Sequence, residues 1–222
     1  MDLIATFEET VRGPWETEGY DVQFRVVDEG EMAIVSFQGS VSKKDWELNF
    51  DFIAQPYKHM DEVWYAHRGF AEGYKSVNDI ILSRIKGKKF VFIEGYSLGA
   101  AYAQLCHEDI RYNYPLIDCG TILFGAPRVF WMPPKSVKER CKDILRVQNY
   151  GDMVGTIPPA WFGFQHIGEQ KTIGSLRYFL KNIFPIKKWD DLPGAKMHLM
   201  SSYREALKGD SIERQTRGRK RA

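Results

Sequence analysis

One serine of the chain lies in a pattern that can turn its hydroxyl into a nucleophile. Residues 95–99 read Gly-Tyr-Ser-Leu-Gly, a match to G-x-S-x-G, and they directly follow the apolar run at 90–93. A sharp turn between a strand and a helix lifts such a serine above the edge of a sheet, and its glycines let the backbone pass where a Cβ would clash. The helix N-terminus also favours developing negative charge. We predict that Ser97 is a nucleophile rather than part of a structural turn.

A serine nucleophile needs a general base, and histidine is the usual one because its pKa lies near neutrality. In enzymes with this turn, the acid and then the histidine follow the serine along the chain, which eliminates His59 and His67. His107 lies ten residues beyond the serine, roughly 15 Å along a helix, so we expect it to be a packing residue. Of the remaining two, His198 in a loop is favoured over His166 near a strand. A hydrogen-bonded core histidine is the alternative for either.

The acid that orients the histidine is predicted to be Asp152. It lies in the loop after the apolar run at 144–147, where the carboxyl end of a strand would place it near the serine. Asp143 precedes that strand and belongs to the opposite edge of the sheet. Asp190 and Asp191 are too near the histidine in sequence to come from a separate strand end. The alternative for Asp152 is a turn-forming role, which is common for aspartate.

The elements that must position these residues alternate along the chain. Residues 22–27 and 32–37 are two apolar runs around a polar link with Gly30, which predicts a β-hairpin. The other predicted strands are 63–66, 90–93, 121–124 and 144–147. The predicted helices are 69–86, 100–112 and 199–208. Strands alternating with helices indicate an α/β fold with a mostly parallel central sheet and helices on both faces.

Composition limits the classes of protein that the chain can represent. The chain has 222 residues with 44% hydrophobic and 27% charged, which is typical of one globular domain. We predict a single domain over residues 1–208 and a basic, disordered tail over 209–222. That tail could contact nucleic acid or an anionic membrane, but a solvated tail is more common. A net charge of +2 argues against nucleic acid as a specific partner.

Cysteine usage and the start of the chain bear on the compartment. Three cysteines, Cys106, Cys119 and Cys141, argue against a disulfide framework and a zinc site, so we expect buried reduced thiols. The first residues lack the basic and apolar regions of a secretory signal. No stretch approaches the roughly 20 apolar residues that span a bilayer. We therefore expect a cytoplasmic protein.

With these residues identified, the chain resembles the class 3 (fungal-type) lipase family over residues from about 30 to 208. The similar segments are Val35–Ser40, His67–Phe70, Phe124–Val129, Arg146–Asp152 with Pro158–Pro159, Phe164–Gly168, and His198 with Tyr203. Ser42–Trp46 is similar to the short lid helix of the family. The chain departs from the family's usual residues at Gln38, Tyr96, Ala100, Phe130 and Gly155. The departures at Tyr96 and Phe130 affect the packing next to the site.

The resemblance implies an α/β-hydrolase fold and a triad of Ser97, Asp152 and His198. It also implies that the backbone N–H groups of Ser40 and Leu98 form an oxyanion hole, and that His166 is structural. Oxyanion donors are typically worth about 3–4 kcal/mol each in the transition state. The reaction would be hydrolysis of a carboxylic ester through an acyl-enzyme, with no metal and no organic cofactor.

The expected substrate is an acylglycerol, a phospholipid or a small ester, bound by a monomer. Apolar side chains at Trp46, Leu48, Phe50 and Phe52, with a second aromatic cluster at 161–164, could line a lid. Basic and aromatic residues mix over 176–189, which suits transient contact with a lipid interface, although a cap packed on the sheet is the alternative. Two other functions stay open, an acyltransferase with the same triad and a non-catalytic lipid-binding protein.

Overall fold

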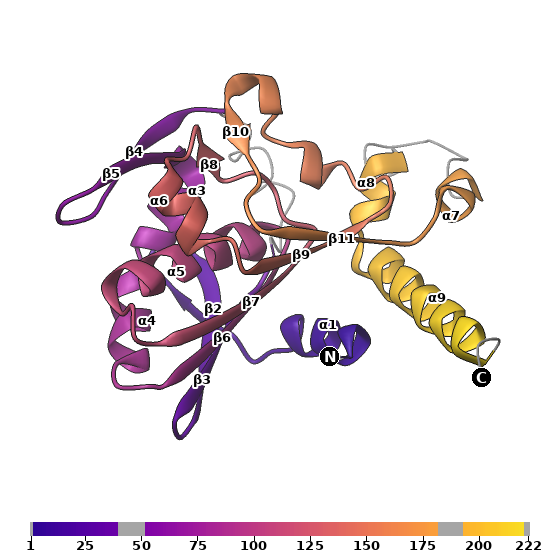
Figure 1. Cartoon of the computed structure of the whole chain (residues 1–222), viewed down its shortest axis with the longest axis horizontal. Coiled ribbons are helices and arrows are strands. Elements are labelled where there is room, and N and C mark those ends of the chain that lie inside the picture. Colours follow the sequence, from indigo (N-terminus) through magenta and orange to yellow (C-terminus); the bar gives the residue numbers. More distant parts are fainter. Residues whose placement is uncertain (1, 40–51, 182–192, 220–222) are drawn as a thin grey trace.

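The computed structural model describes residues 2–39, 52–181 and 193–219, and they form a layered α/β structure around a seven-stranded sheet (Figure 1). The strand order in the sheet is β1-β2-β3-β6-β7-β9-β11. These strands are β1 (Glu16–Glu18), β2 (Val22–Glu29), β3 (Met32–Phe37), β6 (Phe90–Tyr96), β7 (Asp118–Phe124), β9 (Ile144–Asn149) and β11 (Glu169–Ile173). The five strands β3, β6, β7, β9 and β11 are mutually parallel, while β2 pairs antiparallel with both of its neighbours, β1 and β3. The mostly parallel sheet is therefore confirmed.

The predicted hairpin is present, because Phe24 of β2 pairs with Phe37 of β3 in an antiparallel register. The apolar run at 90–93 is the buried middle of β6, at the centre of the sheet, and the strand continues to Tyr96. Its neighbour β7 begins three residues earlier than predicted, since Asp118 pairs with Phe90 in a parallel register. Both strands are longer than their apolar runs, because pairing with a neighbouring strand continues beyond the apolar residues from which the strands were predicted.

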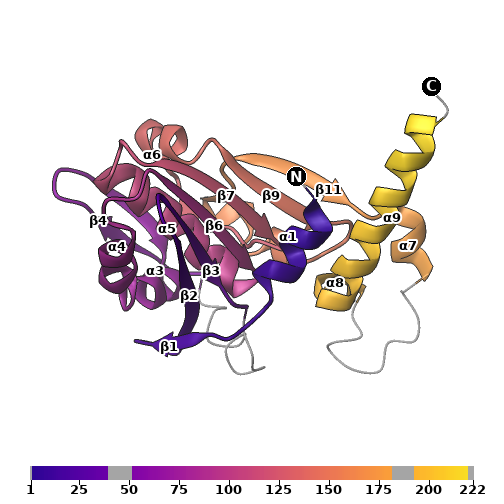
Figure 2. The same cartoon turned by 90° about the horizontal axis from the view of Figure 1, so that it is seen from below.

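Helices cover both faces of this sheet, as Figure 2 shows from below. One face carries α3 (Arg68–Lys75), α4 (Asn78–Ile85), α5 (Leu98–Asn113) and α6 (Lys135–Arg140). The opposite face carries α1 (Leu3–Thr10) and α9 (Met200–Arg219). Side chains alternate between the two faces along each strand. Leu123 thus joins the core beneath α5, while its neighbours Ile122 and Phe124 join the core beneath α1 and α9.

A smaller antiparallel sheet of four strands lies at one end of the molecule, in the order β10-β8-β5-β4. Its strands are β4 (Ala54–Lys58), β5 (Val63–His67), β8 (Phe130–Trp131) and β10 (Phe164–Gln165). The aromatic side chains of Trp64, Phe130 and Phe164 are buried there. Two short 3₁₀ helices, η1 (Val154–Thr156) and η2 (Ala160–Phe162), connect β9 to β10.

The helix predicted over 69–86 is interrupted. Ser76 ends α3 with its hydroxyl bound to the carbonyl of Gly73, and Val77 has a non-helical φ of −128° with its side chain buried. A new helix, α4, starts at Asn78. Helical spacing of apolar residues alone could not locate this break, because Val77 still points into the core.

Of the tail predicted to be disordered over 209–222, the structure describes residues 209–219, and these are helical. The closing helix α9 continues to Arg219. Tyr203, Ala206 and Leu207 bury one side of its first part, so the helix is already nucleated, and adding residues to a nucleated helix costs little. Among the described residues, no helix is long and apolar enough to cross a membrane.

The three cysteines are free thiols, as predicted. Cys106 and Cys141 are fully buried, whereas Cys119 is only partly buried. Burial raises the pKa of each thiol, that of Cys119 to about 12, which keeps all three protonated at neutral pH.

Candidate active site

The turn between β6 and α5 holds Ser97 in a strained conformation. Its φ of 58° and ψ of −123° lie in a region that L residues rarely adopt. A Cβ on Gly95 would lie 2.4 Å from the carbonyl oxygen of Gly99, and one on Gly99 would lie 2.3 Å from that of Phe37. Only glycine fits at either position. The turn therefore requires the glycine pattern that marked it in the sequence.

Ser97, His198 and Asp152 form a continuous hydrogen-bonded chain, although 101 and 46 residues separate the partners. His198 Nε2 lies 2.7 Å from Ser97 Oγ, and His198 Nδ1 lies 2.9 Å from Asp152 Oδ2. A carboxylate can only accept, so Nδ1 carries the proton of the neutral ring and Nε2 accepts from the serine hydroxyl. All three residues are buried. This is the arrangement in which the imidazole can take the serine proton.

Both oxygens of the Asp152 carboxylate have further donors. The backbone N–H of Val154 donates to Oδ1 at 2.8 Å, and the Tyr203 hydroxyl donates to Oδ2 at 2.7 Å. The same tyrosine oxygen accepts from the backbone N–H of Asn149 at 3.1 Å. The carboxylate is thus fixed in orientation by η1 on one side and α9 on the other.

His198 is the last residue of α8 (Pro193–His198), and α9 begins two residues later. The side-chain amide of Asn149 donates to the carbonyl of Met197 at 2.8 Å, which ties α8 to the end of β9. Gly125 has a φ of 60°, and a Cβ there would lie 2.8 Å from Cε1 of the imidazole. The ring therefore occupies space that a side chain at position 125 would take.

Of the two predicted oxyanion donors, Leu98 is described by the structure and directly follows Ser97. Leu98 is the first residue of α5, and the N–H of a first helical residue has no partner within its helix. Ser40 lies outside the described residues, as do Ser42–Trp46, Leu48 and Phe50 of the expected lid, and most of 176–189. Gly39 is described, and a Cβ on it would lie 3.2 Å from Cβ of Ser97. The chain thus passes the nucleophile one residue before Ser40.

Two histidines set aside in the sequence have structural surroundings. The two ring nitrogens of His107 lie 2.8 Å from Thr121 Oγ1 and 2.8 Å from the carbonyl oxygen of Arg140, and burial lowers its pKa to about 4. His166 donates to the carbonyl of Gly155 at 2.8 Å, and burial lowers its pKa to about 3. Both rings pack in the protein rather than approach Ser97.

One group of side chains away from the triad has the composition of a metal site. Ligating atoms of His59, Glu108 and Asp109 lie within 4.8 Å of one another. The carboxylates are already engaged, however. Arg140 Nε donates to Glu108 at 2.7 Å, and the Tyr57 hydroxyl donates to Asp109 at 2.9 Å. We interpret the cluster as an ionic network that holds α6 and the β4–β5 hairpin against α5.

Comparisons with known proteins identify the family of the chain. The family model described as Lipase (class 3) matches residues 34–162, more than half of the chain. The chain belongs to the class 3 lipase family. The α/β-hydrolase fold that the resemblance implied is likewise confirmed by solved lipases of this fold. The triacylglyceride lipase of Rhizomucor miehei superimposes with a TM-score of 0.60 at 27% identity, over 73% of this chain and 66% of that one.

Among the sequence relatives of this chain, a lipase of Rhizomucor miehei is 27% identical over 173 residues, 70% of this chain and 46% of its own length. A secreted mono- and diacylglycerol lipase of Fusarium solani is 30% identical over 142 residues, 60% of this chain and 41% of its own length. This chain therefore spans less than half the length of the curated relatives it matches.

The comparisons contradict the prediction of a cytoplasmic protein. Two of the relatives, from Fusarium solani and Malassezia globosa, are named secreted lipases. The prediction rested on the first residues of the chain, and it was wrong to read a compartment from them. Residues 3–10 form α1, where Phe7 is fully buried under the sheet.

Some residues of the site carried little or no signal in the sequence. The Val154 donor is a backbone group, which any residue except proline could supply. Gly125 lay within a segment similar to the family, but its contact with the imidazole could not be foreseen. Tyr96 stood out only because it departs from the family's usual residue, and its ring lies against His198.

Proposed function

We propose that this class 3 lipase hydrolyses carboxylic esters of acylglycerols, with Ser97 as nucleophile, His198 as general base and acid, and Asp152 as its orienting carboxylate. The observation that carries the proposal is the chain of 2.7 Å and 2.9 Å hydrogen bonds that ends on a strained serine at a helix N-terminus. An ester is the matching substrate, because its alcohol leaves readily once the histidine returns the proton.

In the acylation step, Ser97 Oγ attacks the carbonyl carbon while Nε2 of His198 takes the hydroxyl proton. The charge on the carbonyl oxygen is stabilised by the N–H groups of Leu98 and Ser40. The intermediate then collapses, and the imidazolium gives its proton to the departing alcohol. A water molecule, deprotonated by the same histidine, attacks the acyl-enzyme and releases the acid.

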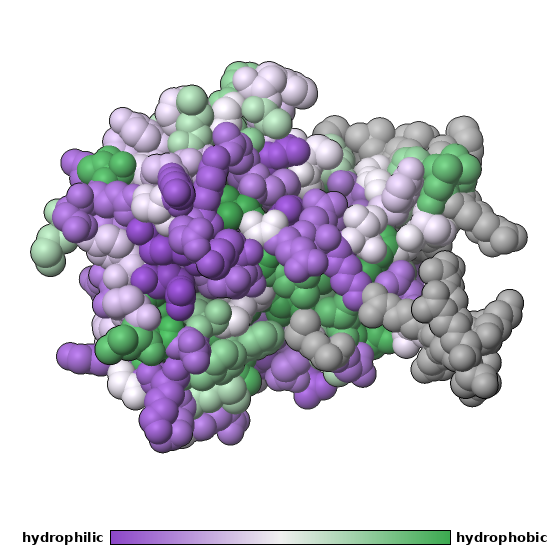
Figure 3. All heavy atoms as spheres, viewed as in Figure 1, coloured by the Kyte–Doolittle hydropathy of each residue, from purple (hydrophilic) through white to green (hydrophobic). Residues whose placement is uncertain are grey.

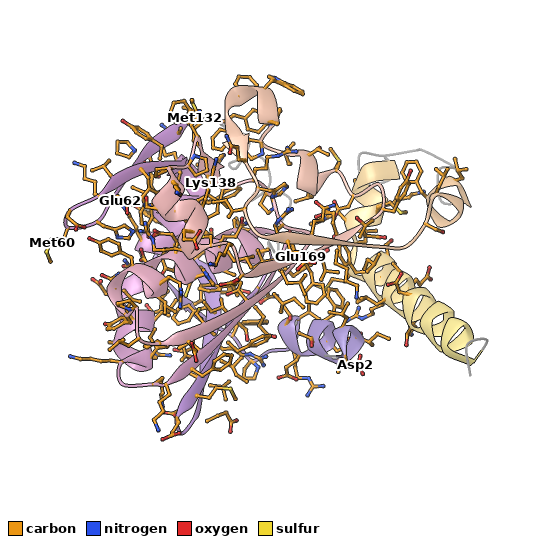
Figure 4. The ribbon with its side chains drawn as sticks, in the orientation of Figure 1. Asp2, Met60, Glu62, Met132, Lys138 and Glu169 are labelled. Carbon is orange, nitrogen blue, oxygen red and sulfur yellow. The ribbon has the colours of Figure 1, made fainter. Side chains whose placement is uncertain are left out.

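A lipid surface is the proposed source of the substrate, and an exposed apolar patch supports this. The patch consists of Trp161, Phe162 and Met132, whose side chains are 83%, 51% and 61% exposed. They adjoin, since the backbone N–H of Met132 donates to the carbonyl of Gly163. Figure 4 labels Met132 close to η2, and the surface over η2 in Figure 3 runs from pale purple to green. Phe52 packs on Phe162 at 5.7 Å between ring centroids.

The nucleophile is tested with Ser97→Ala and soluble p-nitrophenyl esters of increasing chain length. We expect the variant to lose at least about 10³-fold in kcat, because removing a triad member removes the acyl-enzyme route. Wild type, but not the variant, is expected to be labelled by a fluorophosphonate probe. Absence of both hydrolysis and labelling in wild type would refute the proposal. A competing alcohol in the assay identifies an acyltransferase if the ester product dominates.

The lipid patch is tested with the double variant Trp161→Ser, Phe162→Ser. We expect its activity on emulsified diacylglycerol to fall several-fold while its activity on a soluble ester is unchanged. The control is Met60→Ser, which removes a side chain 98% exposed at the tip of the β4–β5 hairpin (Figure 4). Equal losses in the two variants would contradict a role for the patch. Light scattering during these preparations tests the proposed monomer.

A further inference from the structure

Tyr96 is the last residue of β6 and immediately precedes the nucleophile, yet its side chain reaches the residue that acts on that nucleophile. Its hydroxyl donates a hydrogen bond to the backbone carbonyl of His198. Its ring lies almost parallel to the imidazole, with 5.2 Å between centroids and 12° between planes. One side chain therefore contacts both the main chain and the ring of His198.

The hydrogen bond reaches a carbonyl at the end of helix α8. His198 ends α8, and the last carbonyls of a helix lack intrahelical donors. An unpaired buried carbonyl costs roughly as much as a lost hydrogen bond. The Tyr96 hydroxyl donates to this carbonyl from the sheet, so the end of α8 is attached to the strand that leads to Ser97.

Tyr96 is itself held from several sides. The ring of Phe7 in α1 meets it edge-on at 5.7 Å, and the ring of Tyr203 in α9 meets it edge-on at 5.8 Å. Only 6% of Tyr96 is exposed. Burial raises the pKa of its hydroxyl well above the usual value, and the Asp152 carboxylate raises it further, so the hydroxyl keeps its proton and stays a donor.

From this geometry we infer that Tyr96 is a positioning residue for the general base: it holds His198 so that Nε2 faces Ser97 while Nδ1 faces Asp152. The inference rests on the proposed hydrolase function. The imidazole has to serve two partners at 2.7 Å and 2.9 Å, so a small shift of its backbone weakens both hydrogen bonds. Misplacement by 1 Å can cost about 10²-fold in rate.

The test is Tyr96→Phe, which removes the hydroxyl and keeps the ring. We expect kcat on a soluble p-nitrophenyl ester to fall about tenfold with KM unchanged, a loss consistent with partial misalignment. We also expect the acid limb of the kcat/KM profile to move to lower pH, because a histidine held less well against Asp152 is less easily protonated. Replacing Tyr96 by para-aminophenylalanine keeps a donor and should restore most of the activity.

The matched control is Tyr57→Phe. Tyr57 is also buried and also donates one hydrogen bond, to Asp109 at 2.9 Å, near the far end of α5. We expect this variant to lose stability comparably and to keep the kcat and pH profile of wild type. Thermal melting of both variants separates a loss of fold from a loss of alignment.

A double-mutant cycle with Asp152→Asn identifies the route of the effect. If Tyr96 acts by aligning the histidine with this carboxylate, its removal costs little in the Asp152→Asn background. Additive losses, or a folded Tyr96→Phe with the kcat and pH profile of wild type, would overturn the inference while Ser97-dependent hydrolysis still stood. If the Phe variant does not fold, an inactive but folded para-aminophenylalanine variant overturns it and an active one supports it. Failure of the proposed function itself would appear as a wild-type protein that neither hydrolyses the ester nor is labelled by the fluorophosphonate probe.

Discussion

In the described parts of the chain, histidine meets a carboxylate through buried side chains in two places. His198 Nδ1 lies 2.9 Å from Asp152, and His59 Nε2 lies 2.7 Å from Glu108. The distances are similar, but the second nitrogen faces different groups. That of His198 faces the hydroxyl of Ser97, whereas that of His59 faces a further carboxylate, Asp109, at 3.9 Å. Only the first arrangement leaves a nitrogen able to accept a proton from a nucleophile.

The two carboxylates also differ in the charge of their hydrogen-bond donors. Asp152 is bound by two neutral donors, the N–H of Val154 and the hydroxyl of Tyr203. Glu108 is bound by the guanidinium of Arg140, which also pairs with Glu62 at 2.6 Å. Neutral donors orient Asp152 and leave its charge available to an imidazolium, whereas Arg140 neutralises Glu108. A histidine–carboxylate pair is therefore no evidence for catalysis until its other partners are known.

The largest expected effect comes from neutralising each carboxylate in turn. Asp152→Asn should lower kcat about 10⁴-fold with little change in the unfolding free energy, because the imidazole loses the acceptor that fixes its tautomer. Glu108→Gln should leave kcat unchanged and lower the unfolding free energy by about 2–3 kcal/mol, because it breaks a buried ion pair. Ester kinetics and urea unfolding of both variants measure these effects. A tenfold loss of kcat in Glu108→Gln would contradict the distinction between a catalytic His198–Asp152 pair and a structural His59–Glu108 pair.

A second test fills the space beside the imidazole of His198. Gly125→Ala places a methyl group 2.8 Å from His198 Cε1 at a φ of 60°, so we expect kcat to fall about 10²-fold through misplacement of the ring. Gly87 is the control, since it has a φ of 83° and a Cβ there would meet nothing within 4 Å. Gly87→Ala should cost about 1 kcal/mol in stability and no activity. Similar kinetics in the two variants would contradict this account.

The tyrosine that binds Asp152 gives a smaller effect. Tyr203→Phe removes one of the two donors that bind the Asp152 carboxylate besides His198, and it leaves the ring, so we expect a fall in kcat of about tenfold with KM unchanged. Tyr57→Phe, which removes the donor to Asp109 in the other cluster, should not change kcat. Steady-state kinetics on a soluble ester compares them. A Tyr203→Phe enzyme as active as wild type would show that the Val154 N–H holds Asp152 alone.

The smallest effect on activity is expected from a change at His107, which affects acid stability and faces no carboxylate at hydrogen-bonding distance. Burial lowers the pKa of His107 to about 4, below its usual value of 6.5, so between these two pH values the unfolded chain binds a proton that the folded protein does not. Stability is therefore lost as pH falls from 6.5 towards 4. His107→Gln should reduce this loss by about 3 kcal/mol at pH 4. Urea unfolding at pH 7 and pH 4 measures it, and an unchanged difference would refute the assignment.

Much of the fold was predictable because the signals were local. The apolar run at 90–93 is the centre of β6, and the two runs around Gly30 pair as β2 and β3. The errors arose where tertiary contacts decide. Burial of Val77 hides the break between α3 and α4, and the packed face of α9 carries that helix into residues predicted to be disordered.

The sequence by itself determined the nucleophile turn, because Gly95 and Gly99 answer a local steric requirement that residue types reveal. It also narrowed the candidates for the general base to two histidines, since chain order restricts which strand ends can meet. The tertiary structure decided the rest. It brought His198 to Ser97 across 101 residues, chose the Val154 N–H as a donor, and set the Tyr96 ring against the imidazole. These contacts depend on distances between strand ends and on backbone groups that all residues share. Residue types along the sequence do not reveal either.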